Sequence, residues 1–164
     1  MILSLIGGMI LRDRKIGELM LTVDKTVLTP YTPCQMYDLV NDIEKYPEFL
    51  PGCPKTIVHQ REEAIIQATV YITKGPVQHA FTTKNHLKPH EEVYMTLVSG
   101  PFKHLEGWWR FKEKAKQGTD VSFKLQFEFT NKLVQMAFGQ MFQMITEKMM
   151  QAFVKRAKEV YGPR

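Results

Sequence analysis

Histidine is the side chain most often used for proton transfer and metal binding near neutral pH. The sequence holds five histidines, which occur singly at His59, His79, His86, His90 and His104. They form no HExxH motif and no His-x-His pair, and no paired carboxylates accompany them. A catalytic group can be assembled from distant residues in any fold, but this pattern points to no catalytic residue and to no metal ligand. We therefore predict a binding protein and not an enzyme.

Glycines and cysteines add no further reactive site. Gly100 precedes a proline in an expected turn and does not open a helix, so no phosphate-binding loop is predicted. Cys34 and Cys53 lie far apart and have neither CxxC nor zinc spacing. Secreted domains of this size usually carry more cysteines. Both are interpreted as reduced thiols in the cytoplasm, although one disulfide between them is also compatible with the sequence.

The composition is that of one globular domain with a mildly basic surface. The chain has 164 residues, of which 44% are hydrophobic and 24% are charged, and its formal net charge is +5. Chains of this length usually fold around a single core. A positive charge favours anionic partners such as RNA or acidic lipid headgroups, but the charge is mild, and an ordinary solvated basic surface is the simpler explanation.

The first residues carry an apolar run that differs from the rest of the chain. Residues 1–11 are mostly apolar, but no positive charge precedes them and the run is too short to cross a bilayer. Patterned sequence begins only at Leu21. Residues 1–19 are therefore expected to lie outside the fold, as a weak membrane-interface anchor or as the product of an upstream start codon. The domain itself is assigned to residues 20–162.

After this segment, the spacing of the apolar residues predicts one strand, then helices and then further strands. Leu21 to Leu28 is predicted to be a strand, and Thr32 followed by Pro33 is a typical helix start. A second short helix or turn is expected over Tyr46 to Leu50. The period then changes from 3.6 to 2, most clearly where apolar and polar residues alternate from Val121 to Phe129. The remaining strands are expected near residues 55–60, 64–73, 77–88, 92–99 and 105–113.

The chain ends in a long amphipathic helix from Asn131 to Tyr161, before Gly162 and Pro163. At 1.5 Å per residue it would be roughly 45 Å long, enough to cross a whole sheet. Short turns between the strands favour an antiparallel meander. The sequence thus predicts an α+β, helix-grip fold: a curved antiparallel sheet wrapped around a long C-terminal helix, with two short helices after the first strand.

Apolar residues on this helix and in two loops are candidates for a ligand site. Flexible methionine side chains suit a wall that must fit a hydrophobic ligand, although ordinary core packing explains the same stripe. Trp108 and Trp109 are adjacent on a strand, so one faces inward and the other outward; the outward one, taken as Trp108, is a candidate contact. The predicted ligand-binding residues are Val134, Phe138, Met141, Phe142, Ile145 and Met149 on the helix, Tyr46, Phe49, Leu50 and Phe102 at the mouth, and Trp108.

Basic residues gather toward the end of the same helix. They are candidates for phosphate contacts with ribosomal RNA, and cations also stabilise a helix C-terminus through its dipole. The predicted partner-binding residues are Lys148, Lys155, Arg156 and Lys158.

Several stretches resemble the ribosome association toxin (RatA) family, which is related to the mitochondrial coenzyme Q-binding START-domain proteins. They are YPEFLPGC at 46–53, FTTKN at 81–85, GPFKHLEGWWRF at 100–111, and FEFTNKL and QAFVKRAKEVYG in the last forty residues. The resemblance runs from about Met20 to Gly162. Gly52 stands where several mitochondrial and other relatives carry tryptophan in a PWC motif. This difference, like the pattern of the last helix, is closer to the bacterial branch.

The resemblance implies a START-like, polyketide cyclase-like fold with a hydrophobic tunnel and no catalytic constellation. Two functions follow as hypotheses. The first is a cytoplasmic carrier of ubiquinone or a polyisoprenoid lipid, which supports respiration, touches membrane surfaces transiently and needs no cofactor besides that ligand. The second is a toxin, with or without an antitoxin partner, that binds the large ribosomal subunit and blocks subunit association. An aromatase or cyclase is a weaker third hypothesis, and DNA is not an expected partner.

Overall fold

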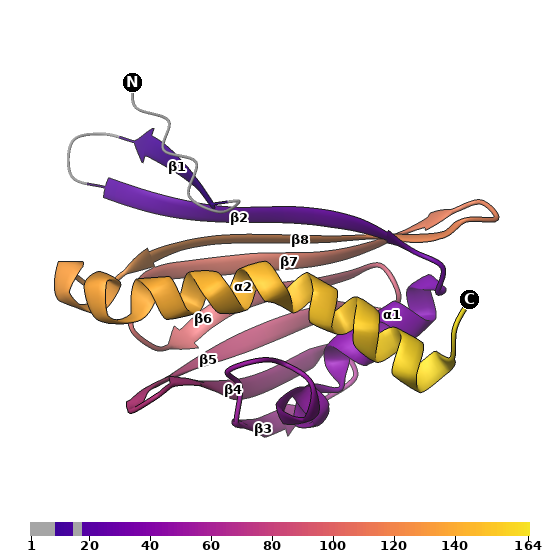
Figure 1. Ribbon diagram of the computed structural model, residues 1–164, viewed down its shortest axis with the longest axis horizontal. Coiled ribbons are helices and arrows are strands. Elements are labelled where there is room, and N and C mark those ends of the chain that lie inside the picture. Colours follow the sequence, from indigo (N-terminus) through magenta and orange to yellow (C-terminus); the bar gives the residue numbers. More distant parts are fainter. Residues whose placement is uncertain (1–8, 15–17) are drawn as a thin grey trace.

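The computed structural model describes residues 9–14 and 18–164, and the side-chain environment from Met20 onward. In this part of the chain a single antiparallel sheet curves around one long helix (Figure 1). The strand order is β1-β2-β8-β7-β6-β5-β4-β3. The eight strands are β1 (Met9–Arg14), β2 (Glu18–Thr29), β3 (Lys55–Arg61), β4 (Ile65–Lys74), β5 (Val77–Lys88), β6 (Glu92–Ser99), β7 (Phe102–Lys114) and β8 (Gly118–Phe129).

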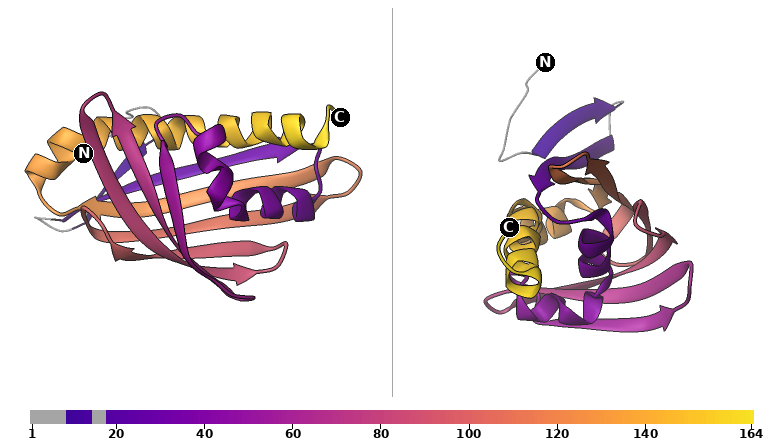
Figure 2. Two further views of the ribbon diagram at one scale, coloured as in Figure 1. Left: turned by 90° about the horizontal axis from the view of Figure 1, so that it is seen from below. Right: turned by 90° about the vertical axis from the view of Figure 1, so that its right-hand side faces the viewer.

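Strands β3 to β8 form the predicted meander, and the first long strand closes onto its far end. β2 pairs with β8, with Val23 opposite Leu125 and Val27 opposite Val121. The segment between β2 and β3 must therefore cross from one edge of the sheet to the other. The two short helices occupy this crossing, as the view from below shows (Figure 2). This layout confirms the predicted helix-grip architecture.

The outermost strand, β1, was not expected from the sequence. Met9 lies opposite Val23 and Arg14 lies opposite Glu18, so this segment extends the sheet beyond β2. A strand can join a sheet edge through backbone hydrogen bonds alone. Such a strand needs no alternation of apolar and polar residues, so its sequence does not reveal it. Residues 1–8 and 15–17 are outside the described residues. The anchor and upstream-start interpretations therefore stay predictions, as does the domain boundary at residue 20.

The first helix, α1 (Pro33–Asn41), begins as its sequence predicts. The Thr32 hydroxyl accepts from the Gln35 backbone amide at 3.2 Å, and the Gln35 side chain accepts from the Thr32 backbone amide at 3.0 Å. This reciprocal pair is a capping box, which satisfies two free amides. The second short helix, the 3₁₀ helix η1 (Ile43–Glu48), begins three residues earlier than predicted and ends before Phe49.

The long helix α2 (Lys132–Tyr161) lies in the trough of the sheet (Figure 2). The Asn131 side chain caps it by accepting from the Val134 amide at 2.9 Å, and Gly162 ends it at a φ of 83°. None of the described helices is both long and apolar enough to span a bilayer. The side chains that α2 buries are Phe138, Met141, Phe142, Ile145, Thr146, Met150, Phe153 and Ala157.

The core between sheet and helix is solid at one end. Around the first turns of α2, the Phe102 ring stacks on Phe129 at 5.3 Å and meets Phe142 at 5.3 Å and Phe138 at 6.0 Å. On β8 the alternation predicted from Val121 to Phe129 is observed, with every apolar member buried. Because aromatic rings fill this end, any space for a ligand must lie farther along the helix.

An apolar cavity beneath the C-terminal helix

A cavity of about 100 Å³ lies beneath the middle of α2. The inner faces of β4 to β8 form its floor, α2 forms its roof, and η1 with the following loop forms one wall. Its lining residues are Ile43, Tyr46, Leu50, Cys53, Ala68, Val70, Ile72, Phe81, Thr83, Asn85, Met95, Leu105, Trp109, Phe123, Leu125, Phe142, Ile145, Thr146 and Met149.

Small residues keep this space open. Ala68 is 1% exposed, and its methyl group stands among larger side chains on the floor. Gly107 on β7 leaves room for Met95, since a Cβ at Gly107 would lie 2.6 Å from the Met95 terminal methyl carbon. Gly52 has a φ of +73°, and a Cβ there would lie 3.0 Å from the Ile145 Cδ1 atom. The loop of this chain therefore favours glycine at position 52.

Within the described part of the chain, the lining is almost wholly apolar and offers no charged side chain. The Tyr46 hydroxyl donates to the Val40 carbonyl oxygen, and the loss of hydration around it raises the pKa of Tyr46. Burial raises the pKa of the Cys53 thiol to about 11. The Thr146 hydroxyl is bonded to the carbonyl oxygens of Phe142 and Gln143, each at 3.0 Å. These lining groups are thus unsuited to exchange protons with a ligand near neutral pH.

The buried Cys53 thiol makes a pH-dependent contribution to stability. Its folded pKa of about 11 lies above the ordinary value of 9.0, so the unfolded chain loses its thiol proton first as the pH rises. Stability should therefore fall between about pH 9 and pH 11. We expect Cys53→Ala to make urea-unfolding midpoints less sensitive to pH in this window. An unchanged pH slope would contradict the burial of the thiol.

Five of the predicted ligand-binding residues line the cavity: Tyr46, Leu50, Phe142, Ile145 and Met149. Phe138, Met141 and Phe102 are buried but belong to the packed core. Val134 and Phe49 are half-buried at the edge of that core. A charge at Phe138 or Met141 would thus disrupt packing, and such variants cannot serve as tests of ligand binding.

Trp108 does not line the cavity, and its neighbour Trp109 does. Trp109 is 3% exposed and lies against Phe123 at 4.7 Å. Trp108 points to the outer face of the sheet, where it stacks on Tyr94 at 5.4 Å with the Arg110 guanidinium 5.8 Å from its ring. Trp108, the predicted ligand contact, therefore lies on the face of the sheet opposite the cavity.

The floor residues on β4 and β5 are not among the predicted ligand-binding residues, because an alternating strand pattern does not distinguish a cavity floor from a packed core. A signal was present: Phe81, Thr83 and Asn85 share one face of β5, and the register of β4 and β5 turns that face inward. Polar residues at successive inward positions are unusual in a core strand, so they could have marked a site.

The predicted basic residues differ in their availability. Lys148, Lys155 and Lys158 are exposed on α2. Arg156 is occupied, since its guanidinium lies 3.0 Å from the Glu48 carboxylate, 4.0 Å from that of Glu159 and 5.3 Å from the Phe49 ring centroid. Arg156 therefore ties α2 to the end of η1 and to the residue that follows it.

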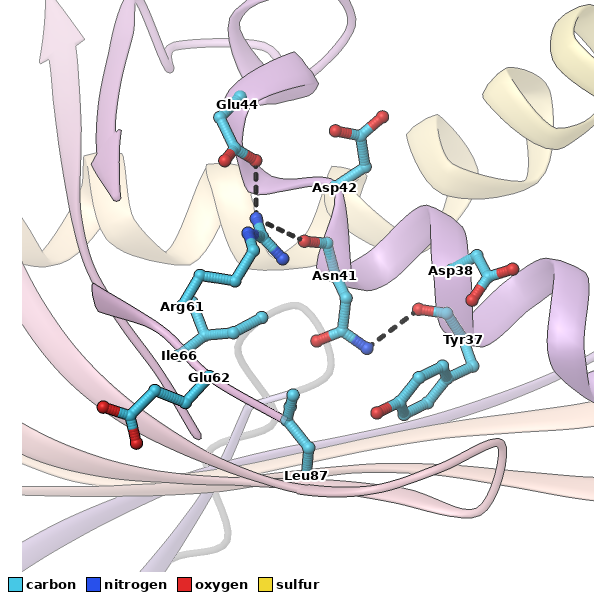
Figure 3. Close-up of a pocket in the computed structure, with 9 residues that line it drawn as sticks. All are labelled: Tyr37, Asp38, Asn41, Asp42, Glu44, Arg61, Glu62, Ile66 and Leu87. Carbon is cyan, nitrogen blue, oxygen red and sulfur yellow. Dashed lines mark hydrogen bonds and ion pairs between the residues drawn. The ribbon is translucent and has the colours of Figure 1, made fainter. Parts of the chain in front are cut away.

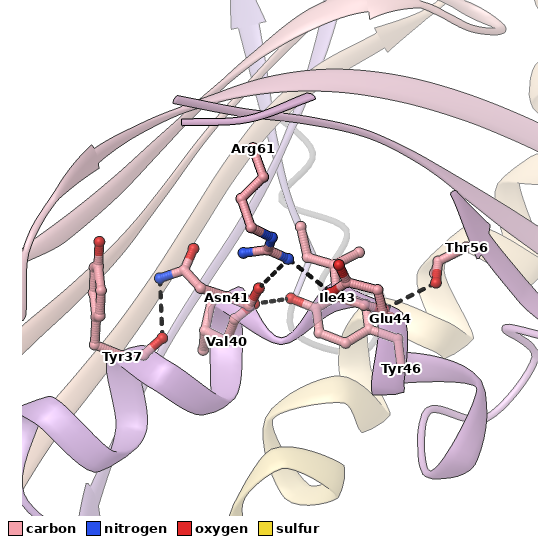
Figure 4. A network of polar contacts seen from close by, with 8 residues as sticks. All are labelled: Tyr37, Val40, Asn41, Ile43, Glu44, Tyr46, Thr56 and Arg61. Atoms are coloured by element: carbon pink, nitrogen blue, oxygen red, sulfur yellow. Dashed lines mark hydrogen bonds and ion pairs between the residues drawn. The ribbon is translucent and has the colours of Figure 1, made fainter. Parts of the chain in front are cut away.

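A second, polar pocket of about 500 Å³ lies on the surface between α1 and β3 (Figure 3). Arg61 reaches across it and donates to the Glu44 carboxylate at 2.7 Å and to the Asn41 carbonyl oxygen at 3.2 Å. Nearby, the Thr56 hydroxyl donates to the Ile43 carbonyl oxygen at 2.9 Å (Figure 4). These bonds hold η1 against the sheet and thereby position Tyr46 in the cavity wall.

Cys34, Asp38 and His90 also come together at the surface, with their potential ligand atoms within 4.8 Å of one another. Their sequence spacing, 34, 38 and 90, gave no sign of this cluster. All three are exposed, and the His90 ring packs edge-on against Tyr37 at 5.5 Å. The two cysteines are both free.

Known proteins resemble this chain over most of its length. The sequence profile described as "Polyketide cyclase / dehydrase and lipid transport" matches residues 29–154. The "Ribosome association toxin RatA" of Escherichia coli is 43% identical over 87% of this chain and 90% of its own. The "Coenzyme Q-binding protein COQ10 homolog B, mitochondrial" of Xenopus laevis is 29% identical over 78% of this chain and 54% of its own.

Among solved structures, the protein TTHA0849 of Thermus thermophilus superimposes with a TM-score of 0.73 at 19% identity, over 85% of this chain and 98% of its own. This likeness shows the fold alone. Together with the START-like helix-grip architecture and the apolar cavity, the match over residues 29–154 shows that the chain belongs to the polyketide cyclase / dehydrase and lipid transport family.

Proposed function

We propose that this protein binds a neutral hydrophobic molecule of the quinone or polyisoprenoid class between the sheet and α2. The observation that carries the proposal is the uncharged, apolar cavity enclosed by the helix. Buried apolar surface is the main source of affinity for such ligands. The lipid-transport description of the family and the name of the coenzyme Q-binding relative support the same class of ligand.

The cavity must enlarge to take such a ligand. Its volume of about 100 Å³ is smaller than the roughly 300–1,000 Å³ of typical ligand sites. Met95 and Met149 lie on opposite sides of the space, and their unbranched side chains change rotamer at little cost. Ligand binding should therefore move these thioethers and shift the middle of α2 away from the sheet.

An apolar tip at the start of α2 is suited to contact a membrane while the ligand is exchanged. Leu133 and Met136 are 78% and 79% exposed. The His79 ring lies 4.5 Å from Phe138, which brings the β4–β5 hairpin and the exposed Val77 to the same end of the molecule. Exposed apolar side chains of this size insert readily into a lipid interface.

The double variant Leu133→Glu, Met136→Glu should bind zwitterionic vesicles about tenfold more weakly or worse. Two apolar side chains that could insert into the lipid are replaced by charged ones, which do not enter it. Vesicle flotation measures this. Val160→Glu is the matched control, since Val160 is 50% exposed at the other end of α2. Equal loss in both variants would contradict the membrane-contact assignment.

The direct test of the binding proposal is native mass spectrometry of the protein purified from its own cells, with lipid extraction of the same sample. A bound quinone or polyisoprenoid is the expected result. A protein that is empty as purified and stays empty after incubation with ubiquinone would overturn the proposal.

Association with the large ribosomal subunit is a second candidate function. It is favoured by the 43% identity to RatA and by the exposed lysines 148, 155 and 158 on α2. Overexpression should then raise free subunits at the expense of intact ribosomes in sucrose gradients. Replacing the three lysines by glutamine should restore the normal profile, because phosphate contacts depend on charge. A profile unaffected by overexpression would contradict this candidate.

Catalysis of the cyclase kind is not proposed. Such chemistry needs a proton donor or acceptor beside the substrate, and the described lining residues supply only hydroxyl, amide, thiol and indole groups without a charged partner.

A further inference from the structure

Thr83 and Asn85 form a polar pair on the floor of the apolar cavity. They are 7% and 6% exposed, and both line the space beneath α2. The Thr83 hydroxyl donates to the Asn85 Oδ1 atom at 2.8 Å. Two residues apart on β5, they share the inward face of the strand. The pair is therefore held in place by the sheet and not by a mobile loop.

The Asn85 side-chain amide keeps unused donors. An asparagine amide has two N–H groups besides its oxygen, and no described residue accepts a hydrogen bond from Asn85 Nδ2. The Tyr46 and Thr146 hydroxyls on the lining, in contrast, already have backbone acceptors. Asn85 lines the cavity, and buried amides nearly always find a partner, so an acceptor on a bound ligand would complete the hydrogen bonds of Asn85 Nδ2.

The surroundings limit what this donor can bind. Among the described residues no lysine, arginine or histidine lines the cavity, so a carboxylate or phosphate would be buried without a counter-charge. A pure hydrocarbon would leave the amide unpaired. Building on the proposed function, we propose that Asn85 recognises a neutral carbonyl oxygen on an otherwise apolar ligand, as in a quinone or an enone. Thr83 holds the amide with its N–H groups free for that oxygen.

The test compares two ligands in the wild-type protein and in Asn85→Leu, which keeps the side-chain size and removes the donor. The first ligand is a benzoquinone with a short alkyl tail, and the second is the benzene with the same tail. Isothermal titration calorimetry measures the affinities. Lys84→Gln, on the outer face between Thr83 and Asn85, is the matched control.

Wild type and Lys84→Gln should prefer the quinone, and Asn85→Leu should lose about tenfold in quinone affinity while it keeps its affinity for the alkylbenzene. In the wild type, the Asn85 side-chain NH₂ signals should move with quinone and stay in place with alkylbenzene in ¹⁵N–¹H spectra. A structural role for Asn85 would weaken both ligands alike and would overturn the inference.

Failure of the inference can be told apart from failure of the proposed function. If folded wild type binds both ligands equally, the cavity binds apolar molecules but Asn85 recognises no carbonyl, and only the inference falls. If wild type binds neither ligand, the proposed function falls and the inference with it. Tighter binding of the matching fatty acid would also overturn the assignment of a neutral ligand.

Discussion

Gly118→Ala should remove a large part of the stability of the folded protein. Gly118 begins β8 at a φ of +112°, and a Cβ there would lie 1.8 Å from the Thr29 carbonyl oxygen and 2.8 Å from the Pro30 Cα atom. These are backbone atoms, so the clash cannot be relieved by a change of rotamer. We expect a loss of about 4 kcal/mol or more, a large part of the roughly 5–15 kcal/mol that stabilises a typical domain.

Urea unfolding followed by circular dichroism measures the effect, and Gly75→Ala is its control. Gly75 also has a positive φ, +58°, but apart from its two chain neighbours no described residue has an atom within 4 Å of the place that a Cβ would take there. Gly75→Ala therefore reports the backbone strain alone, about 1–2 kcal/mol. Equal losses at the two positions would show that β8 does not approach Thr29 as closely as described.

The contact between Gly118 and Thr29 lies next to both helices, so the destabilisation by Gly118→Ala should extend to them. The Thr119 hydroxyl donates to the Tyr31 carbonyl oxygen at 2.7 Å, and the Tyr31 hydroxyl donates to the Gly162 carbonyl oxygen at 2.7 Å. The start of β8, the segment before α1 and the end of α2 are thus joined at one end of the molecule. A shift of Thr29 would disturb all three elements.

Ala68→Leu should abolish most ligand binding without loss of stability. Position 68 faces the cavity at 1% exposure, and the added carbon atoms would occupy part of its volume of about 100 Å³. Filling an existing apolar space costs little and often stabilises a core, whereas the ligand loses the space it needs. We expect quinone affinity to fall at least about tenfold, and the melting temperature to stay level or rise.

Ala80→Leu adds the same atoms outside the cavity and serves as the control. Ala80 lies opposite Tyr71 on β4 and does not line the cavity. Affinities from calorimetry and melting temperatures from scanning fluorimetry would be compared for both variants. Full affinity in Ala68→Leu would place the ligand elsewhere on the protein.

The sequence predicted the elements well because their periods and end signals are local. The Thr32 cap, the alternation from Val121 to Phe129 and the Gly162 stop each act within a few residues, and all three are present as expected. The strand β1 lacked such a signal, since its pairing depends on an edge formed by β2.

The position of the cavity could not be predicted from the apolar stripe of α2. Phe138 and Ile145 both face the sheet, and both are buried. What separates them lies on other strands: Phe102 and Phe129 fill the space beneath Phe138, whereas Ala68 leaves space near Ile145. The cavity thus depends on contacts between residues far apart in the chain, which periodicity does not report.

The two adjacent tryptophans of β7 lie on opposite faces of the sheet, so the fluorescence of each reports on a different surface. Trp109 faces the cavity and Trp108 faces outward beside Tyr94, and the chain has no other tryptophan. In Trp108→Phe, emission comes from the cavity alone and should be quenched by a bound quinone. In Trp109→Phe it comes from the outer face and should respond only to a partner that covers the sheet. One strand therefore provides separate fluorescent reports on the small ligand and on a macromolecule.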